Sequence, residues 1–272
     1  MKAASREALA SAETLLDQVL AGDPAVAASA NTGLELFDVV KVLDGNRDLR
    51  VSLNDAAASE EARKSLVNTL FGDKVTPATL RVLEAVVSNQ WSSGRDIVNG
   101  LVALGRRALM RGAEAQGQLG QVEDELFRLS RVLDREGELT QLLTDRTAPS
   151  ERKRGLLANV LYGKVSMFTE ALALQSIDRP ERNPIDDIAN LAKSAAALQG
   201  RTIAFVTTAG EMNEGQQAVL AEKLGTIYGR AMSIHSEVDT SLLGGMTIRV
   251  DDEVIDGSTA GKIARLRTAL TK

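Results

Sequence analysis

The stretch ELFDVVKVLDGNRDLRVSLNDAAASEEARKSLVNTLFGDKV, residues 35–75, recurs 90 positions later as ELFRLSRVLDREGELTQLLTDRTAPSERKRGLLANVLYGKV, residues 125–165. The two copies align without a gap and are identical at 14 of 41 positions, most of them apolar. Charged positions often change sign between the copies, as Asp38 does against Arg128. Apolar identity with divergent charge indicates one duplicated fold that carries two different surfaces.

Apolar residues recur at helical spacing on both sides of this repeat. Near the N-terminus Ala8, Ala12, Leu15 and Val19 are three or four positions apart, and the sequence GDP at 22–24 predicts the end of that helix. Alternating β-branched residues are absent before residue 200, and aromatic residues make up only 3% of the chain. A helical bundle is therefore expected, with further helices at 34–43, 60–71, 77–87 and 96–110.

The repeat divides this helical region into two related modules. We expect helical bundle module 1 over residues 1–110 and module 2 over residues 111–198. Residues 1–100 carry a net charge of −4, whereas residues 101–199 carry none. An acidic first module favours a basic segment in a binding partner.

The pattern changes at residue 200. Residues 201–209 form a buried-strand run, 212–230 an amphipathic helix and 232–239 an alternating strand. Two more strands are expected at 245–250 and 253–257, and Ser258 is a candidate N-cap for a last helix. The expected fold class is α+β: two related all-α helical-bundle modules followed by a small α/β C-terminal domain over residues 199–272.

Composition excludes several classes of site. The chain of 272 residues has no cysteine and one histidine, which removes disulfides, thiolate metal sites and multi-histidine metal sites. Its formal charge of −5 argues against a general nucleic-acid binder, because that function needs a basic face. No long apolar run is found, so we expect a soluble protein that reaches a membrane only through partners.

The segment GSTAGK, residues 257–262, invites comparison with a phosphate-binding loop. That loop needs four residues between its glycine and the Gly-Lys pair, followed by Ser or Thr. Here three residues separate Gly257 from Gly261, and Ile263 follows Lys262. We therefore expect no nucleotide site, and no cofactor.

No set of residues has a catalytic or metal-binding pattern. His235 alternates with its neighbours in an expected strand and is interpreted as a surface or edge residue. The pair Gly244 and Gly245 is interpreted as structural, because glycine permits positive φ or close backbone approach at the start of a strand. We expect no catalytic residue, no metal ligand and no enzyme activity in the isolated chain.

The segment VDTSLLGGMTIRVDDEVIDGSTAGKIARLRTAL, residues 238–270, resembles the C-terminal signature of the delta subunit of F-type ATP synthases, which is related to the mitochondrial oligomycin-sensitivity-conferring protein. Thr240 stands where that family often has proline. The usual member has one helical bundle, and this chain has about 90 residues more, which resembles the actinobacterial form. The signature residues, which the resemblance marks as structural, are Asp239, Leu243, Gly244, Gly245, Asp256, Gly257 and Ser258.

The resemblance implies a non-catalytic subunit of the peripheral stalk. In that family the helical domain holds an N-terminal helix of an alpha subunit, at the catalytic head of alpha and beta subunits. The C-terminal domain meets the b subunit that rises from the membrane. The implied role is to couple rotation to ATP synthesis and proton transport, at the cytoplasmic face of the cell membrane. The resemblance does not say which helical copy binds the alpha helix.

Two other classes remain open at this point. A helical adaptor or scaffold unrelated to ATP synthase would also be built from helical bundles, and its glycine pair would be coincidental. An enzyme built on the C-terminal domain is disfavoured by the missing catalytic residues.

Overall fold

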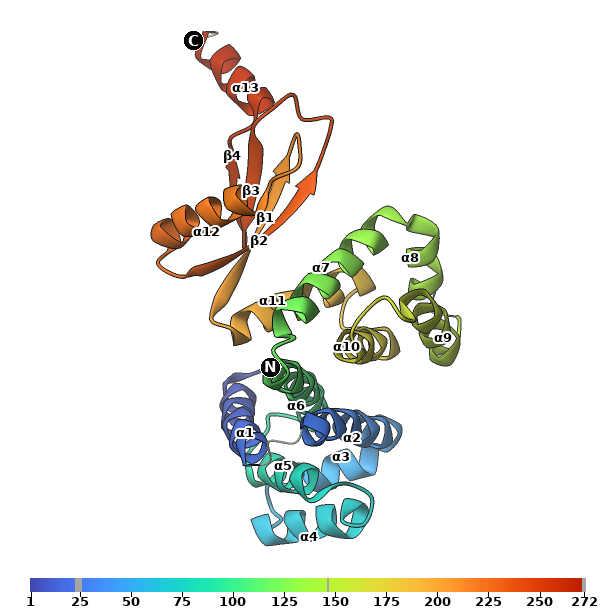
Figure 1. The fold of residues 1–272 in the computed structure, drawn as a ribbon. Coiled ribbons are helices and arrows are strands. Elements are labelled where there is room, and N and C mark those ends of the chain that lie inside the picture. The colour runs from blue at the N-terminus through green and yellow to red at the C-terminus, as the bar shows by residue number, and fades with distance from the viewer. Residues whose placement is uncertain (23–25, 146, 271–272) are drawn as a thin grey trace. The chain divides into compact units, whose positions relative to one another are not determined.

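The computed structural model describes residues 1–22, 26–145 and 147–270, and Figure 1 shows their ribbon. The chain forms two compact units. The first unit contains Met1–Val122 and Glu138–Pro184, and the second contains Glu123–Gly137 and Ile185–Lys272. The three-domain division expected from the sequence stays a prediction.

The first unit is helical. It contains α1 (Ala3–Ala21), α2 (Val26–Gly45), α3 (Arg47–Leu53), α4 (Glu60–Phe71), α5 (Pro77–Ser88), α6 (Gly94–Ala115), α8 (Gly137–Thr144), α9 (Ser150–Leu161) and α10 (Met167–Asp178). A further helix, α7 (Leu119–Arg135), starts in this unit and continues in the second. The helices expected at 60–71 and 77–87 are confirmed almost to the residue.

Polar residues set where several of these helices begin. The hydroxyl of Ser59 accepts a hydrogen bond from the backbone N–H of Ala62 at the start of α4. Ser93 does the same for Asp96 at the start of α6. Each hydroxyl satisfies a backbone donor that has no partner within its helix. The stop expected at 22–24 agrees with the end of α1 at Ala21, although positions 23 and 24 lie outside the described residues.

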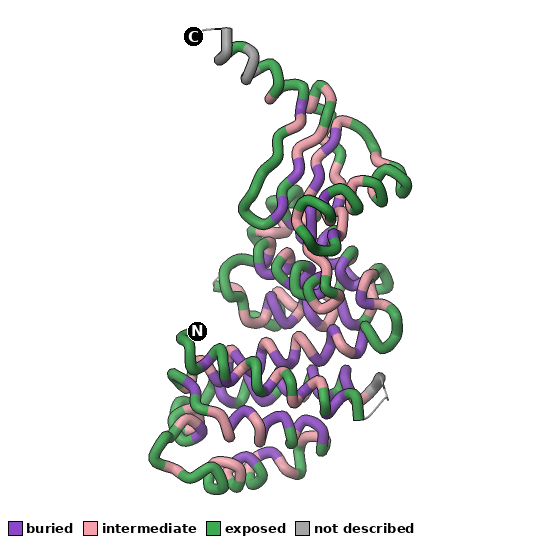
Figure 2. Tube along the Cα trace, turned by 90° about the vertical axis from the view of Figure 1, so that its left-hand side faces the viewer, coloured by how far each residue is buried: buried purple, intermediate pink, exposed green. Residues whose placement is uncertain are grey.

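A continuous apolar core joins α1 to α6. The side chains of Leu16, Leu36, Leu43, Leu101 and Leu104 are at most 1% exposed within it. Figure 2 shows buried purple stretches alternating with exposed green ones along the helices. Because each helix has one apolar face, burial of those faces against one another holds the bundle together.

The second unit contains a four-stranded sheet. Its helices are α11 (Pro184–Leu198), α12 (Glu214–Tyr228) and α13 (Thr259–Leu270); the first residue of α11, Pro184, is assigned to the first unit. Its strands are β1 (Arg201–Thr208), β2 (Ala231–Val238), β3 (Met246–Val250) and β4 (Glu253–Asp256). The strand order is β2-β1-β3-β4; β1 and β2 are parallel, and the other pairs are antiparallel. All four strands and both helices expected after residue 200 are present, and the fold class is confirmed.

Each face of this sheet is in contact with a helix. Ala204, Val206 and Ile248 form an apolar cluster with Leu224 of α12. On the opposite face, Phe127 of α7 lies against Phe205 of β1, with ring centroids 5.5 Å apart. The alternation of side chains along a strand separates these two sets of contacts.

Candidate functional site

The glycine pair and the end of the β3–β4 hairpin come together in the second unit. The backbone N–H of Thr259 donates to the carbonyl of Gly244 over 2.9 Å, and that of Gly257 donates to the carbonyl of Met246 over 3.0 Å. The residues Gly244, Gly245, Asp256, Gly257 and Ser258 thus form one junction between the hairpin and α13.

Glycine is required in this junction. Gly245 has φ +79°, and a Cβ at this position would lie 2.5 Å from the carbonyl oxygen of Gly257. Gly244 has φ +144°, and its Cβ would lie 3.0 Å from the hydroxyl of Thr259. Any other residue would be both strained and crowded here.

The other two signature residues lie outside this junction. The carboxylate of Asp239 accepts the backbone N–H of Ser241 at 2.9 Å in the loop before the glycine pair, and hydrogen bonds from Ser241 lower the pKa of Asp239. The side chain of Leu243 is 80% exposed. The sequence alone did not indicate that this apolar side chain is left in solvent.

The GSTAGK segment has the structure of a helix cap. The hydroxyl of Ser258 accepts the backbone N–H of Gly261 at 3.0 Å, which confirms Ser258 as the N-cap of α13. The carboxylate of Asp256 lies against Gly261 and accepts the N–H of Ser258 at 2.9 Å. A phosphate would need the N–H groups that these side chains already occupy, and it would face a negative charge.

His235 does lie on an edge strand, since β2 is at one edge of the sheet, but its interpretation as a surface residue is wrong. Its ring is 5% exposed, and its Nε2 lies 2.9 Å from a carboxylate oxygen of Glu123 on α7. The ring also stacks on Phe127 at 4.3 Å. The alternation within β2 shows that the side chain faces one side of the sheet, but nothing local to it reveals that α7, over 100 residues earlier, covers that side.

Glu123 is the centre of a buried polar cluster that sequence reasoning missed. It is 1% exposed, and its other carboxylate oxygen accepts from the guanidinium of Arg201 at 2.9 Å. Burial alone would raise the pKa of Glu123, but hydrogen bonds from His235 and Ser233 and the charge of Arg201 outweigh it and lower that pKa. The cluster therefore holds α7 on the sheet by charge-assisted hydrogen bonds.

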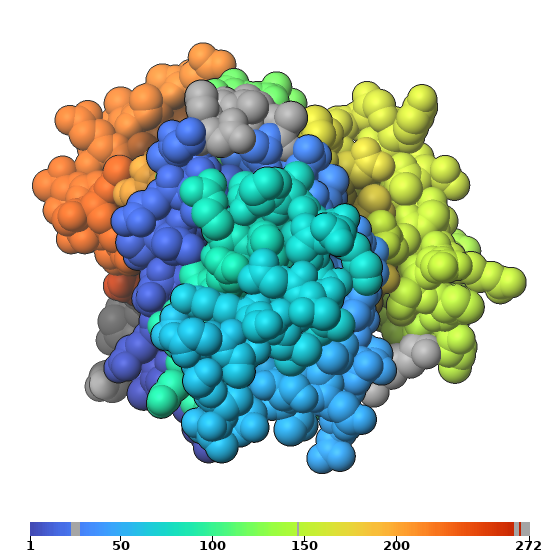
Figure 3. All heavy atoms as spheres, turned by 90° about the horizontal axis from the view of Figure 1, so that it is seen from below, coloured from blue at the N-terminus to red at the C-terminus, as the bar shows by residue number. Residues whose placement is uncertain are grey.

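An open groove lies between α1 and α5 in the first unit. Its volume is about 870 Å³. Figure 3 shows the dark-blue atoms of α1 beside the teal atoms of α5 on the face of this unit that the view presents. The groove is lined by Ser11, Thr14, Leu15, Gln18, Val19, Lys64, Arg81, Glu84, Ala85, Ser88 and Asn89.

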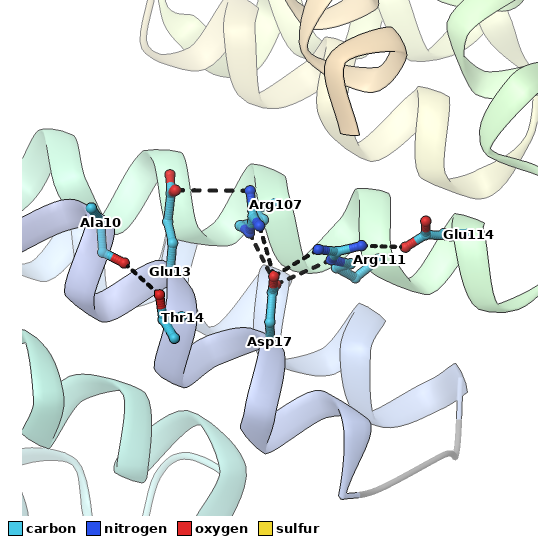
Figure 4. Close-up of polar contacts among 7 residues, drawn as sticks. All are labelled: Ala10, Glu13, Thr14, Asp17, Arg107, Arg111 and Glu114. Carbon is cyan, nitrogen blue, oxygen red and sulfur yellow. Dashed lines mark hydrogen bonds and ion pairs between the residues drawn. The ribbon is translucent and has the colours of Figure 1, made fainter. Parts of the chain in front are cut away.

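Ion pairs fix the α1 wall of this groove to α6. Asp17 accepts from Arg107 and from Arg111, each with a shortest contact of 2.6 Å (Figure 4). Partial burial raises the pKa of Asp17, but the hydrogen bonds and charges of the two guanidinium groups outweigh it and bring the pKa down to about 2. Asp17 is thus ionised at neutral pH, and α1 is held by a network of charges instead of an isolated pair.

Within residues 1–22, 26–145 and 147–270, no three acidic or histidine side chains are grouped so that they could hold a metal ion. In the same ranges, no helix has the length and apolar character needed to cross a bilayer.

Comparison with known proteins identifies the family. Residues 106–270 match the family model described as ATP synthase delta (OSCP) subunit. A protein of Corynebacterium aurimucosum named ATP synthase subunit delta is 72% identical over 99% of this chain and 100% of its own length. A protein of the same name from Corynebacterium glutamicum strain R is 64% identical over 99% of both chains.

A chain of the Toxoplasma gondii mitochondrial ATP synthase hexamer aligns with a TM-score of 0.37 and 18% identity, over 61% of this chain and 95% of that chain. This likeness is too low to support any conclusion.

The relatives over the whole length exclude the alternative of a scaffold unrelated to ATP synthase, and they confirm the resemblance seen in residues 238–270. The chain therefore belongs to the ATP synthase delta (OSCP) subunit family and is a non-catalytic, peripheral-stalk subunit of an F-type ATP synthase, associated with other subunits of that complex.

Proposed function

We propose that this chain ties the catalytic head to the stalk by holding a different partner with each unit. The first unit binds the N-terminal helix of an alpha subunit, next to the beta subunits of the head. The second unit binds the b subunit. The chain thereby lies at the cytoplasmic face of the cell membrane, to which its partners attach it.

The open groove between α1 and α5 is the observation that carries this proposal. It has a volume of about 870 Å³, is open to solvent and is lined mainly by residues of α1 and α5. Leu15, Val19 and Ala85 give it an apolar floor, and polar side chains surround them. An amphipathic helix, which has one apolar face and polar flanks, complements such a groove.

Exposed apolar side chains support the second contact. Leu243 is 80% exposed beside the glycine junction, Val254 of β4 is 58% exposed and Ile263 of α13 is 43% exposed. Single exposed apolar residues are common, but these three come from the loop before β3, from β4 and from α13, so each of these segments offers an apolar side chain to a partner. Contact with a stalk helix would remove them from water.

The mechanism is mechanical. A rotary motor produces work only if its head is held still while the central part turns, because an unheld head would rotate with it. The chain contributes no reacting group; it contributes two attachments and a folded body that transmits force between them.

Crosslinking in the assembled complex tests the proposal. The chain has no native cysteine, so single substitutions Gln18→Cys and Leu243→Cys give unique attachment points for a photoreactive label. We expect position 18 to crosslink to the alpha subunit and position 243 to the b subunit. Lys223→Cys, on the exposed side of α12, is the control and should label neither. Crosslinks from position 18 to b alone, or from neither position to these partners, would contradict the proposal.

A further inference from the structure

The sequence repeat continues in the positions of the helices. Arg47 and Gly137 begin α3 and α8, Glu60 and Ser150 begin α4 and α9, and Pro77 and Met167 begin α5 and α10; each pair is separated by 90 residues. The same offset moves α1 from residues 3–21 to 93–111, which is where α6 lies. The helix α6 thus ends the first copy and also stands where the first helix of the second copy belongs.

The α1/α5 groove consequently has a counterpart between α6 and α10. Moved by 90 positions, Lys64, Arg81 and Glu84 of the first groove correspond to Arg154, Ala171 and Leu174. These residues, with Gln175 and Asp178, line a smaller cavity of about 350 Å³ in the first unit. The opposite wall of that cavity is formed by α2, through Leu34, Phe37, Asp38 and Lys41.

The helix α2 packs closely on the floor of this second groove. A Cβ on Gly105 of α6 would lie 2.5 Å from the ring of Phe37, and a Cβ on Gly33 would lie 2.8 Å from the side chain of Leu109. The two glycines let the backbones of α2 and α6 approach each other. A partner helix could not occupy this position without displacing α2.

Equivalent positions differ in burial accordingly. Leu101 and Leu104 on α6 are 1% and 0% exposed. Their counterparts on α1 are Ser11 and Thr14, which are exposed. The buried positions on α6 are thus apolar, and the equivalent exposed positions on α1 are polar.

We infer that α2 is a built-in occupant of the second groove, so that each chain binds one external helix, in the α1/α5 groove. This inference rests on the proposed function for the identity of that helix. The family model begins at residue 106, within α6, so the matched part of the chain contains the groove that α2 covers. The segment before residue 106 contains α2, which covers that groove, and also α1 and α5, which form the open groove. The second copy therefore lengthens the chain without providing a second binding site for a helix.

The open groove also defines the chemistry of its occupant. Ser11, Thr14 and Gln18 call for a helix with polar side chains flanking a narrow apolar stripe. Glu84 accepts a hydrogen bond from Asn68 and Lys64 pairs with Glu60, whereas Arg81 has neither a hydrogen bond from its side chain nor an ion pair within the described part of the chain. An acidic side chain of the partner helix would pair with Arg81. An acidic partner side chain at this position differs from the basic partner segment that the net charge of residues 1–100 led us to expect.

Calorimetric titration of the full chain with a synthetic peptide of the alpha subunit N-terminus tests the inference. We expect one peptide per chain. Arg81→Glu should weaken binding at least tenfold, and the loss should shrink at high salt because it is electrostatic. The matched variant Met167→Glu, which changes an exposed residue of the second groove, should leave the dissociation constant within twofold. Two peptides per chain, or equal losses from both variants, would overturn the inference.

A covalent lock distinguishes this inference from the proposed function. In the cysteine-free chain, Leu34→Cys with Met167→Cys places one thiol on α2 and one on α10 in the same cavity, where a short bis-maleimide can join them. We expect efficient crosslinking in the free chain, and unchanged affinity and stoichiometry afterwards. Failure to crosslink, or loss of a bound peptide on locking, would refute the inference. Efficient crosslinking with no peptide binding at all would instead refute the proposed function.

Discussion

At the scale of single residues, the contact of Gly245 with Gly257 decides how the hairpin enters α13. There is no space for a side chain between the two backbones, and the φ of Gly245 lies in the left-handed region. The same junction carries five of the seven family-signature residues. We propose that their role is structural, and that contacts with partners depend on them only indirectly.

Gly245→Val is expected to destabilise the second unit by about 1–3 kcal/mol through backbone strain. Hydrogen exchange of the sheet amides, followed by mass spectrometry, measures the effect as faster exchange between residues 201 and 256. Gly210→Val is the control, because a Cβ at Gly210 meets nothing within 4 Å and its φ is not positive. Equal protection in the two variants would show that position 245 needs no glycine.

Glu123 gives a second test, in which pH is the variable. The pKa of Glu123 is lowered in the folded chain, so the ionised carboxylate stabilises the fold above its ordinary pKa of 4.5, and that contribution is lost as the pH falls below this value. Glu123→Gln should cost about 1–3 kcal/mol at pH 7 by weakening a buried, charge-assisted hydrogen-bond cluster. It should also flatten the dependence of stability on pH in the acid range. Glu136→Gln, at an exposed position in the same unit, should do neither.

At the scale of elements, the ion pairs of Asp17 join α1 to α6 and so hold one wall of the open groove. Asp17→Asn should lower the stability of the first unit by about 1 kcal/mol, since the network is partly exposed. The fluorescence of Trp91, which is the sole tryptophan and is buried in this unit, reports its urea unfolding.

The stabilising effect of Asp17 should depend on pH. The pKa of Asp17 is lowered from 3.8 to about 2, so its stabilising effect is complete above about pH 4 and declines as pH falls from 3.8 towards 2. The difference between wild type and Asp17→Asn should narrow over that window. Asp38→Asn, which removes an exposed pair with Lys41, should change stability little at any pH. A constant difference between pH 5 and pH 3 would contradict the assignment.

The two copies should not be interchangeable. Replacing residues 35–75 by the sequence of 125–165 keeps most apolar positions but turns Asp38 into Arg, in the cavity that Arg154 also lines. Helicity measured by circular dichroism should stay near that of the wild type. The packing of α2 in this cavity should weaken, and assembly into the complex should fail. Full assembly by the exchanged chain would refute this.

The sequence predicted the elements better than their contacts. Helical periodicity found α4 and α5, and the apolar identities revealed the duplication. The short helix α3 was missed, because seven residues give too few turns for a periodic signal. The burial of His235 and the cover formed by α2 were also missed, since both depend on side chains brought together from distant positions. Residue patterns predict single helices or strands, whereas a groove or a buried cluster is formed by side chains from at least two of them.

At the scale of the whole molecule, two units that carry no catalytic group act by being attached at different places. Family membership establishes the stalk role, and the repeat explains how extra length was added without adding a second open groove. Loss of either attachment should have the same effect on the complex: hydrolysis by the head continues, and its coupling to the proton gradient is lost.

Proton-driven ATP synthesis in inverted membrane vesicles tests this central claim most directly. Vesicles depleted of the chain are supplied with wild type, Arg81→Glu or Gly245→Val, and synthesis is compared with hydrolysis by the same heads. The account predicts that wild type restores synthesis, that both variants restore much less, and that hydrolysis by the heads is equal in all three. Full synthesis without the chain, or with a variant shown to have lost its groove affinity or its folded sheet, would contradict the account.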